Sequence, residues 1–451
     1  MGYHLTHFQQ TTMTQSLHLS RHAVACSLAL VGSLVLANQP STAFEANYDE
    51  SNIPAYTLPN PLVAQNGSPI TSAEQWNKVR RPELLALFEH HVYGVSPKPC
   101  EIRSQVVGSV SVFDQLATRT EVDVFFGKAE DAVSMRLMIY VPNQRSGAVP
   151  AFIGLNFQGN HSVDPDPAIA LNSGWFRVGK NGTTDDNKTT DKARGTATSR
   201  WPIKEILGRG YAVVTIYYGD IDPDFDDGFK NGIHGKLGDQ LGDVAAESRW
   251  GSIAAWAYGL SRALDFLGSD ADLGIDAKKV AVIGHSRLGK TALWAGASDP
   301  RFAMVISNNS GCGGAALSRR AIGETVGRIN TSFPHWFCDQ FTKYNENEDA
   351  CPVDQHQLIA LVAPRPVYVA SASGDKWADP KGEFMAAAAA DSVYRLLGTD
   401  GMGGEAAPVK MPPAEQPING GSIGYHLRTG KHDVTDYDWK QYMDFADRHL
   451  K

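Results

Sequence analysis

A single serine stands in a glycine-rich turn between an apolar run and a predicted helix. Residues 280–290 read VAVIGHSRLGK, and small residues flank Ser286, although the second glycine follows the serine by three places. A tight strand-to-helix turn without bulky neighbours exposes the serine hydroxyl at the edge of a sheet. The helix predicted over 288–297 directs its first N–H groups at the same point. Ser286 is therefore the candidate nucleophile, and a purely structural turn is the alternative.

A serine hydroxyl is a weak nucleophile that needs a base, and the base needs an acid to orient it. In α/β-hydrolases these three residues occur in the order serine, acid, histidine, each on a loop after a strand. Asp375 follows the apolar run 366–371, and His432 follows the run 423–428. Ser286, Asp375 and His432 therefore form the predicted catalytic set.

Other residues compete for the base and acid roles. His426 is the rival base, but it lies inside the last predicted strand, where a packed histidine is expected. Asp379 and Asp433 are alternative acids with a less direct position after a strand. Asp375 itself could instead cap a helix or form a turn, because aspartate favours both positions.

The elements that must position these residues alternate along the chain. Strands are predicted at 122–126, 134–141, 151–156, 211–218, 280–283, 303–307, 367–371 and 423–428. Helices are predicted at 72–94, 202–207, 252–267, 288–297, 382–397 and 436–449. The first three strands are interpreted as an antiparallel lead-in, and the others predict a mainly parallel sheet with helices on both faces. This is an α/β fold of the α/β-hydrolase type, with insertions over 178–200 and 318–362.

Composition indicates an ordinary globular protein. The chain has 451 residues, of which 42% are hydrophobic and 20% charged, and its net charge of −8 argues against nucleic acid as a partner. Large α/β folds reach this length as one domain, so we expect a single catalytic domain over 44–451. We further expect a monomer that needs no cofactor and no metal.

The N-terminal segment has the pattern of a secretory signal. Arg21 precedes an uncharged apolar stretch over 23–37, which is short for a membrane span, and small residues follow it. Residues 1–43 are therefore predicted to be a signal peptide and leader, and the protein to be secreted or periplasmic, without a membrane span in the mature chain. Export permits disulfides among the remaining cysteines, with Cys312–Cys338 favoured and buried thiols as the alternative. Those cysteines are Cys100, Cys312, Cys338 and Cys351.

A family resemblance follows from several motifs taken together. They are GHSRLGKTALWAGA at 284–297, NNSGCGGAALSRR at 308–320, PHWFC at 334–338 and YHLRTGKHDVTDYDW at 425–439. These segments resemble the bacterial glucuronoyl esterases, and the resemblance covers most of the mature chain. It implies an α/β-hydrolase that cleaves esters between lignin alcohols and 4-O-methyl-glucuronic acid on xylan, so that the partner is a polysaccharide.

The resemblance also implies a role for each matching residue. Ser286 would be the nucleophile and His432 the base. Arg287 would stabilise the oxyanion, because a guanidinium beside the reacting carbonyl stabilises the charge that develops there. The pocket that recognises the uronate would be lined by Lys290, Glu324 and Trp377. The alternatives are a solvated Arg287 or Lys290, an ion pair of Glu324 with Arg319 or Arg320, and a Trp377 that belongs to the core.

One position departs from the pattern of some family members. Where they have a catalytic glutamate after the strand that follows the nucleophile, this chain has Asn309. An amide carries no charge to stabilise an imidazolium, so the acid role is assigned to Asp375. Two other functions stay open: a carbohydrate deacetylase on the same fold, and an inactive carbohydrate-binding homologue.

The segment 222–228 imitates the first half of a calcium-binding EF-hand loop. Its twelfth position is Ile233, where a bidentate glutamate is required. We therefore interpret this segment as an acidic surface loop.

Overall fold

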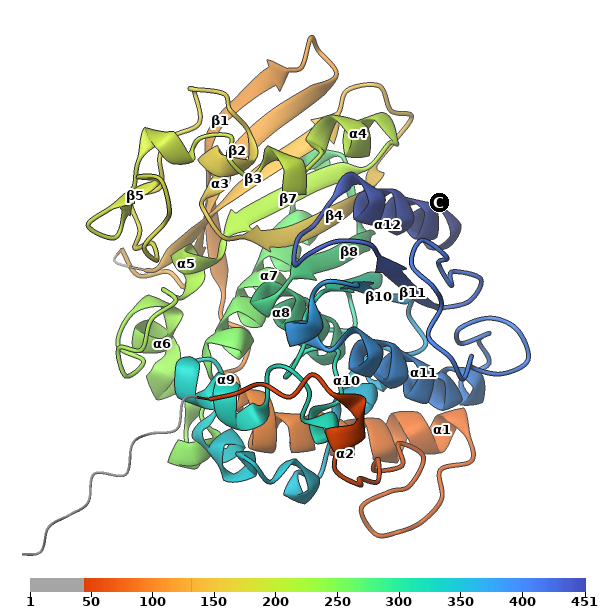
Figure 1. The fold of residues 1–451 in the computed structure, drawn as a ribbon. Coiled ribbons are helices and arrows are strands. Elements are labelled where there is room, and N and C mark those ends of the chain that lie inside the picture. Colours follow the sequence, from red (N-terminus) through yellow and green to blue (C-terminus); the bar gives the residue numbers. More distant parts are fainter. Residues whose placement is uncertain (1–43, 131) are drawn as a thin grey trace, which may run out of the picture. The chain divides into compact units, whose positions relative to one another are not determined.

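A nine-stranded sheet forms the centre of the fold (Figure 1). The computed structural model describes residues 44–130 and 132–451, so the predicted signal peptide lies outside the described residues. In spatial order the strands are β1 (Ile102–Val112), β2 (Ala117–Phe126), β3 (Ser134–Pro142), β7 (Ala212–Tyr217), β4 (Val149–Asn156), β8 (Ile275–His285), β9 (Met304–Asn308), β10 (Val367–Ala372) and β11 (Ile423–Arg428). The predicted α/β-hydrolase fold is confirmed.

The sheet is antiparallel at one end and parallel over the rest. β1, β2, β3 and β7 pair antiparallel in succession, whereas β7, β4, β8, β9, β10 and β11 pair parallel. The prediction that 151–156 belongs to the antiparallel lead-in is wrong, because β4 lies between β7 and β8 and is buried on both faces. β1 was not predicted from the sequence, since this edge strand exposes most of its side chains and has no clear apolar pattern.

Two hydrophobic cores lie on opposite faces of the sheet. Along β8, Val280 and Val282 belong to one core, and Ala281 and Ile283 belong to the other. A strand that is buried on both faces reads as an unbroken apolar run, which is why the sequence identified β8 clearly. The first face is covered by α7 (Ser252–Ser269), α8 (Arg287–Ser298), α10 (Gln355–Ala360) and α11 (Pro380–Leu396), and the second by α4 (Ile203–Gly208) and α12 (Asp436–His449).

The remaining segments are short elements around this centre. The helix predicted over 72–94 is a continuous series of α1 (Ala73–Gln75), a π-helical turn, α2 (Arg81–Phe88) and a second π-helical turn that ends at Tyr93. The insertion over 178–200 contains the small hairpin of β5 (Thr184–Asp185) and β6 (Lys188–Thr189), and the insertion over 318–362 contains α9 (Val326–Ser332). α3 (Asn160–Val163) precedes the first insertion, and α5 (Tyr218–Ile221) and α6 (Gly232–Leu237) lie between the two.

The predicted disulfide is wrong. The cysteines in the described part of the chain, Cys100, Cys312, Cys338 and Cys351, are all free. The two cysteines of the favoured pair lie in different environments. Cys312 belongs to a turn whose backbone carbonyl accepts a hydrogen bond from Lys290, and the Cys338 thiol contacts the carbonyl of His90. Among the described residues, no helix is both long and apolar enough to cross a membrane.

Candidate active site

The candidate nucleophile occupies a strained turn between β8 and α8. Ser286 has φ 58° and ψ −130°, a backbone conformation that costs most side chains energy. The glycines around it permit this turn. A Cβ atom at Gly284 would lie 1.8 Å from the carbonyl oxygen of Leu288, and one at Gly289 would lie 3.0 Å from the Cβ of Ser310. The sequence departs from the usual glycine spacing, yet the strand, the sharp turn and the helix are those that a nucleophilic serine requires.

His432 and Asp375, which the sequence predicts as base and acid, are hydrogen-bonded to each other. The Nδ1–H of His432 donates to Oδ2 of Asp375 at 2.6 Å, which leaves Nε2 of the ring as the basic nitrogen. Burial raises the pKa of Asp375, but the hydrogen bonds from His432 and Asn309 outweigh it and hold the pKa below its ordinary value. Asp375 is therefore ionised at neutral pH and able to stabilise an imidazolium.

A second histidine fixes the position of the base. The rings of His285 and His432 lie 4.4 Å apart, centroid to centroid, at an angle of 42°. His285 is buried, and its Nδ1–H donates to Oδ1 of Asn308 at 2.6 Å. Burial and the neighbouring His432 lower the pKa of His285, so that its ring is neutral. Because His285 directly precedes Ser286, this contact holds the ring of the base beside the nucleophilic turn.

The competing candidates have structural partners. His426 is fully buried and bonds to Asp438 and to the hydroxyl of Tyr368. The side chain of Asp379 accepts from Arg320 at 2.7 Å, and that of Asp433 accepts from Arg200 at 2.7 Å. The geometry therefore favours Asp375 and His432 over these alternatives.

Asn309 supports the acid instead of replacing it. Its Nδ2–H donates to Oδ2 of Asp375 at 2.8 Å, on the same oxygen that accepts from His432. Asn309 has φ 46° at the end of β9, next to the strand that carries Asp375. The departure from the glutamate pattern thus leaves one carboxylate in the site, held by two donors.

Arg287 is held rigidly next to the nucleophile. Its guanidinium pairs with the carboxylate of Asp224 and lies over the rings of Phe157, Phe333 and Trp336, 4.9–5.8 Å from their centroids. Its Nε is buried without a partner. The side chain as a whole is 20% exposed, so part of it remains open to the solvent beside Ser286.

Asp224, which anchors Arg287, was not identified from the sequence. Its side chain accepts hydrogen bonds from His335, the indole of Trp336, Tyr218 and Arg177. Burial raises the pKa of Asp224, but these donors and Arg287 outweigh it and keep the carboxyl ionised. The prediction that 222–228 is an acidic surface loop is therefore wrong at two positions, because Asp222 and Asp224 are 5% and 2% exposed. In the described residues, no group of three or more His, Cys, Asp or Glu side chains is placed to hold a metal ion.

Hydrogen bonds connect Lys290 to Glu324 and Glu324 to Trp377, as expected for neighbours in the wall of one pocket. The Nζ of Lys290 donates to the carbonyls of Ser310 and Cys312, each at 2.6 Å, and to Oε2 of Glu324 at 3.2 Å. These bonds use all three N–H groups of the lysine, which therefore orients Glu324. The backbone N–H of Glu324 donates to the carbonyl of Trp377 at 3.0 Å.

A buried glutamate beneath the site was also missed. Oε1 of Glu383 accepts from the backbone N–H groups of Ser310 and Gly311 at 2.7 and 3.0 Å, and Oε2 lies 2.6 Å from the hydroxyl of Ser371. Burial raises the pKa of Glu383 to about 8. Glu383 therefore holds the turn that follows Asn309. No sequence motif distinguishes it from an exposed helix residue.

A serine on a strained turn, with a histidine and an aspartate at neighbouring strand ends, is the arrangement of a serine hydrolase of the α/β-hydrolase fold. Comparison with known proteins shows which family within this class the chain resembles. A family model for fungal glucuronyl esterases matches residues 242–398. Carbohydrate esterase MZ0003, from an unknown prokaryotic organism, is 52% identical over 405 residues, which cover 90% of this chain and 92% of that protein.

Two less similar relatives have names that refer to glucuronoyl esters. The structure of a glucuronoyl esterase from Solibacter usitatus is 45% identical, covers 89% of this chain and 100% of its own, and superposes with a TM-score of 0.80. The 4-O-methyl-glucuronoyl methylesterase of Schizophyllum commune is 28% identical over 76% of this chain and 74% of that protein. The chain belongs to the glucuronoyl esterases, family 15 of the carbohydrate esterases.

Proposed function

We propose that this protein hydrolyses esters of glucuronic acid, in particular those that join lignin alcohols to (4-O-methyl-)glucuronic acid on xylan. The observation that carries the proposal is the placement of Arg287 next to Ser286, where its partly exposed side chain carries a fixed positive charge. The names of the relatives support the same substrate class. A deacetylase has little need of this arginine or of the Glu324–Trp377 wall.

In the first half of the proposed reaction, Ser286 attacks the C6 carbonyl of the uronate. His432 takes the proton of the serine hydroxyl at Nε2, while Asp375 stabilises the imidazolium through Nδ1. The bond from the serine oxygen to C6 forms, and negative charge develops on the carbonyl oxygen. Arg287 and the first N–H groups of α8 stabilise that charge.

In the second half, the bond from C6 to the alcohol oxygen breaks, and His432 returns its proton to the leaving alcohol. A water molecule, deprotonated by the same nitrogen, then attacks the acyl-enzyme. The products are the free uronic acid and Ser286 in its original state. Glu324 accepts hydrogen bonds from sugar hydroxyls, and Trp377 offers a flat apolar face to the ring.

Kinetics on a benzyl ester of glucuronic acid test the proposal. We expect turnover that Ser286→Ala abolishes without a change in melting temperature. Acetylated xylo-oligosaccharides serve as the competing substrate. A higher kcat/KM on the acetyl esters would instead make the protein a deacetylase, and binding of xylan without hydrolysis of any ester would make it an inactive homologue.

We also propose that the protein is exported, since its polysaccharide substrate lies outside the cytoplasm. We propose in addition that it acts as a monomer. The signal pattern over 1–43 supports export. N-terminal sequencing of the protein recovered outside the cytoplasm should find a chain that begins near residue 44. Size-exclusion chromatography with light scattering should give the mass of one chain.

A further inference from the structure

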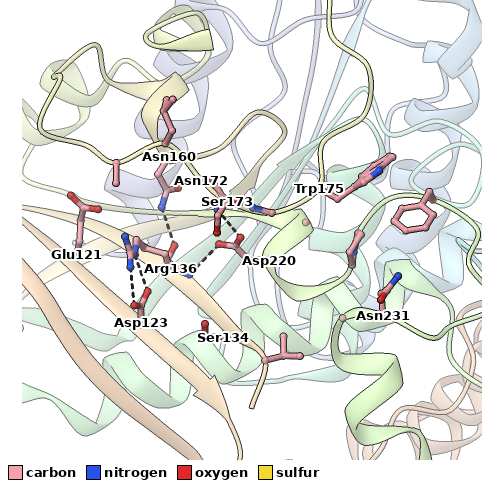
Figure 2. Close-up of a pocket in the computed structure, with 18 residues that line it drawn as sticks. Glu121, Asp123, Ser134, Arg136, Asn160, Asn172, Ser173, Trp175, Asp220 and Asn231 are labelled. Carbon is pink, nitrogen blue, oxygen red and sulfur yellow. Dashed lines mark hydrogen bonds and ion pairs between the residues drawn. The ribbon is translucent and has the colours of Figure 1, made fainter. Parts of the chain in front are cut away.

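A second pocket, of about 550 Å³, lies on the antiparallel side of the fold (Figure 2). It is bounded by β2 and β3, by the loop 170–175, and by the segment that runs from α5 to α6. Neither Ser286 nor His432 nor Asp375 lines it. The pocket is therefore separate from the candidate active site.

One end of the pocket presents polar groups in fixed positions. Oδ1 of Asp220 accepts from Nδ2 of Asn172 at 2.6 Å, and Oδ2 accepts from the backbone N–H of Arg136 at 3.2 Å. The guanidinium of Arg136 makes two hydrogen bonds of 2.8 Å to Asp123. Burial raises the pKa of Asp220 to about 6, so its carboxylate is an acceptor at neutral pH. These groups are ordered before any ligand arrives.

The other end of the pocket is aromatic. The rings of Trp175 and Phe225 lie 4.6 Å apart, and both residues are partly exposed and line the pocket. Figure 2 shows Trp175 well apart from the cluster of Asp123, Arg136 and Asp220. An apolar platform that faces a set of hydrogen-bonding groups suits a ligand with one flat apolar face and several hydroxyls.

The charges of the pocket exclude other ligand classes. The carboxylates of Glu121, Asp123 and Asp220 and the guanidinium of Arg136 line it, so a uronate or phosphate would meet a net negative wall. The described residues also hold no group of three or more His, Cys, Asp or Glu side chains placed to bind a metal ion. A neutral molecule rich in hydroxyl groups fits both ends.

We propose that this pocket binds a neutral pyranose unit of the polysaccharide that carries the ester, such as a xylose of the main chain. This inference rests on the proposed function for the identity of the polymer. One wall of the pocket adjoins the anchor of Arg287 along the chain, because Pro223 and Phe225 line the pocket and flank Asp224, whose carboxylate holds Arg287. The pocket thus adds affinity for the polymer without taking part in the chemistry.

Calorimetric titration of the exported chain with xylotetraose tests this binding site. Trp175→Ala should weaken binding about tenfold, because it removes the larger part of the aromatic platform. Val178→Ala, three residues further along the chain but 84% exposed and outside the pocket, is the matched control and should bind like the wild type. If Trp175→Ala binds xylotetraose as tightly as the control, the pocket is not the site and the inference is wrong.

Kinetics separate this inference from the proposed function. On benzyl glucuronate, Trp175→Ala should keep the wild-type kcat and KM, whereas on a glucuronoyl ester attached to xylan its KM should rise about tenfold. Suppose that the wild type hydrolyses neither ester but binds xylotetraose, and that the Trp175→Ala variant binds it more weakly. The proposed function then fails and the sugar site stands. If both esters are hydrolysed and Trp175→Ala changes neither KM, the sugar site fails alone.

Discussion

At the scale of single residues, the site depends on one carboxylate with two donors. Asp375 accepts from both His432 and Asn309 through the same oxygen. The sequence predicted Ser286, Asp375 and His432, of which Asp375 and His432 are hydrogen-bonded in the structure, from their order and their positions after strands. It did not identify Asp224, because nothing in a run of aspartates tells which of them the folded chain buries under an arginine.

We predict that Asp375→Ala lowers kcat on benzyl glucuronate by about 10³- to 10⁴-fold, since the imidazolium loses its counter-charge and its orientation. Asn309→Ala removes one hydrogen bond of about 1 kcal/mol and should lower kcat by about tenfold or less. Steady-state kinetics of the two purified variants, with melting temperatures as a check on folding, give the comparison. Similar losses in both variants would contradict the assignment of the acid.

At the scale of elements, the turn between β8 and α8 holds the serine in a strained conformation. Ser286→Gly and Ser286→Ala both remove the hydroxyl, but only glycine adopts φ 58° without strain. Relief of strain outweighs the greater freedom of glycine in the unfolded chain, so we expect the glycine variant to be more stable by about 1 kcal/mol. Urea unfolding of the two inactive variants measures this difference. Equal stability would show that the turn is not strained.

The helix α11 carries a buried carboxyl under the same site, and this predicts a pH effect on stability. Because burial raises the pKa of Glu383 to about 8, folding binds a proton that the unfolded chain has lost above about pH 4.3. The stability that this proton contributes is fully present below that pH and is lost as the pH rises to about 8. Glutamine mimics the protonated form and has no such dependence.

We therefore expect Glu383→Gln to gain stability over the wild type as the pH rises from about 5 to 8, by up to about 1.4 kcal/mol per pH unit. Urea unfolding at pH 5, 6.5 and 8 measures the gain. Glu405→Gln, at an exposed position, is the control and should follow the wild type. If the Glu383→Gln and wild-type curves stay parallel, Glu383 is ionised in the folded protein.

The elements themselves were predictable where the chain is buried on both sides. β11 and α12 begin and end at the residues that the sequence pattern indicates, because their apolar periods are regular and their flanks are polar. The strand β1 and the direction of β4 were not predictable. An exposed edge strand has no apolar period, and the pairing partner of a strand is set by segments that are distant in the chain. Glu383 was missed for the same reason, as only the folded chain places it under the turn.

At the scale of the whole molecule, the described part of the fold contains no disulfide cross-link. Its described cysteines are free, and burial raises the pKa of the Cys312, Cys338 and Cys351 thiols. Two large cores on a nine-stranded sheet supply the stability that small exported proteins take from disulfides.

We predict that a chain that begins at residue 44, after the proposed signal peptide, shows four reactive thiols after denaturation without a reductant. In the native state we expect slow reaction of at most Cys100, which is the only one of the four that is not buried. Titration with a thiol reagent, in the presence and absence of guanidinium, measures both values. Two thiols in the denatured sample would instead indicate one disulfide.

The histidine side of the site is more exposed than the side formed by Lys290 and Glu324, and this difference has a consequence for selectivity. The His432 side chain is 40% exposed, whereas those of Lys290 and Glu324 are 4% and 9% exposed. In the proposed mechanism the departing alcohol receives its proton from His432, so we expect it to leave through the open side and the sugar acid to be enclosed. We therefore expect strict discrimination among acids and tolerance of bulky alcohols, which would suit the proposed esters, whose alcohol side is an irregular polymer.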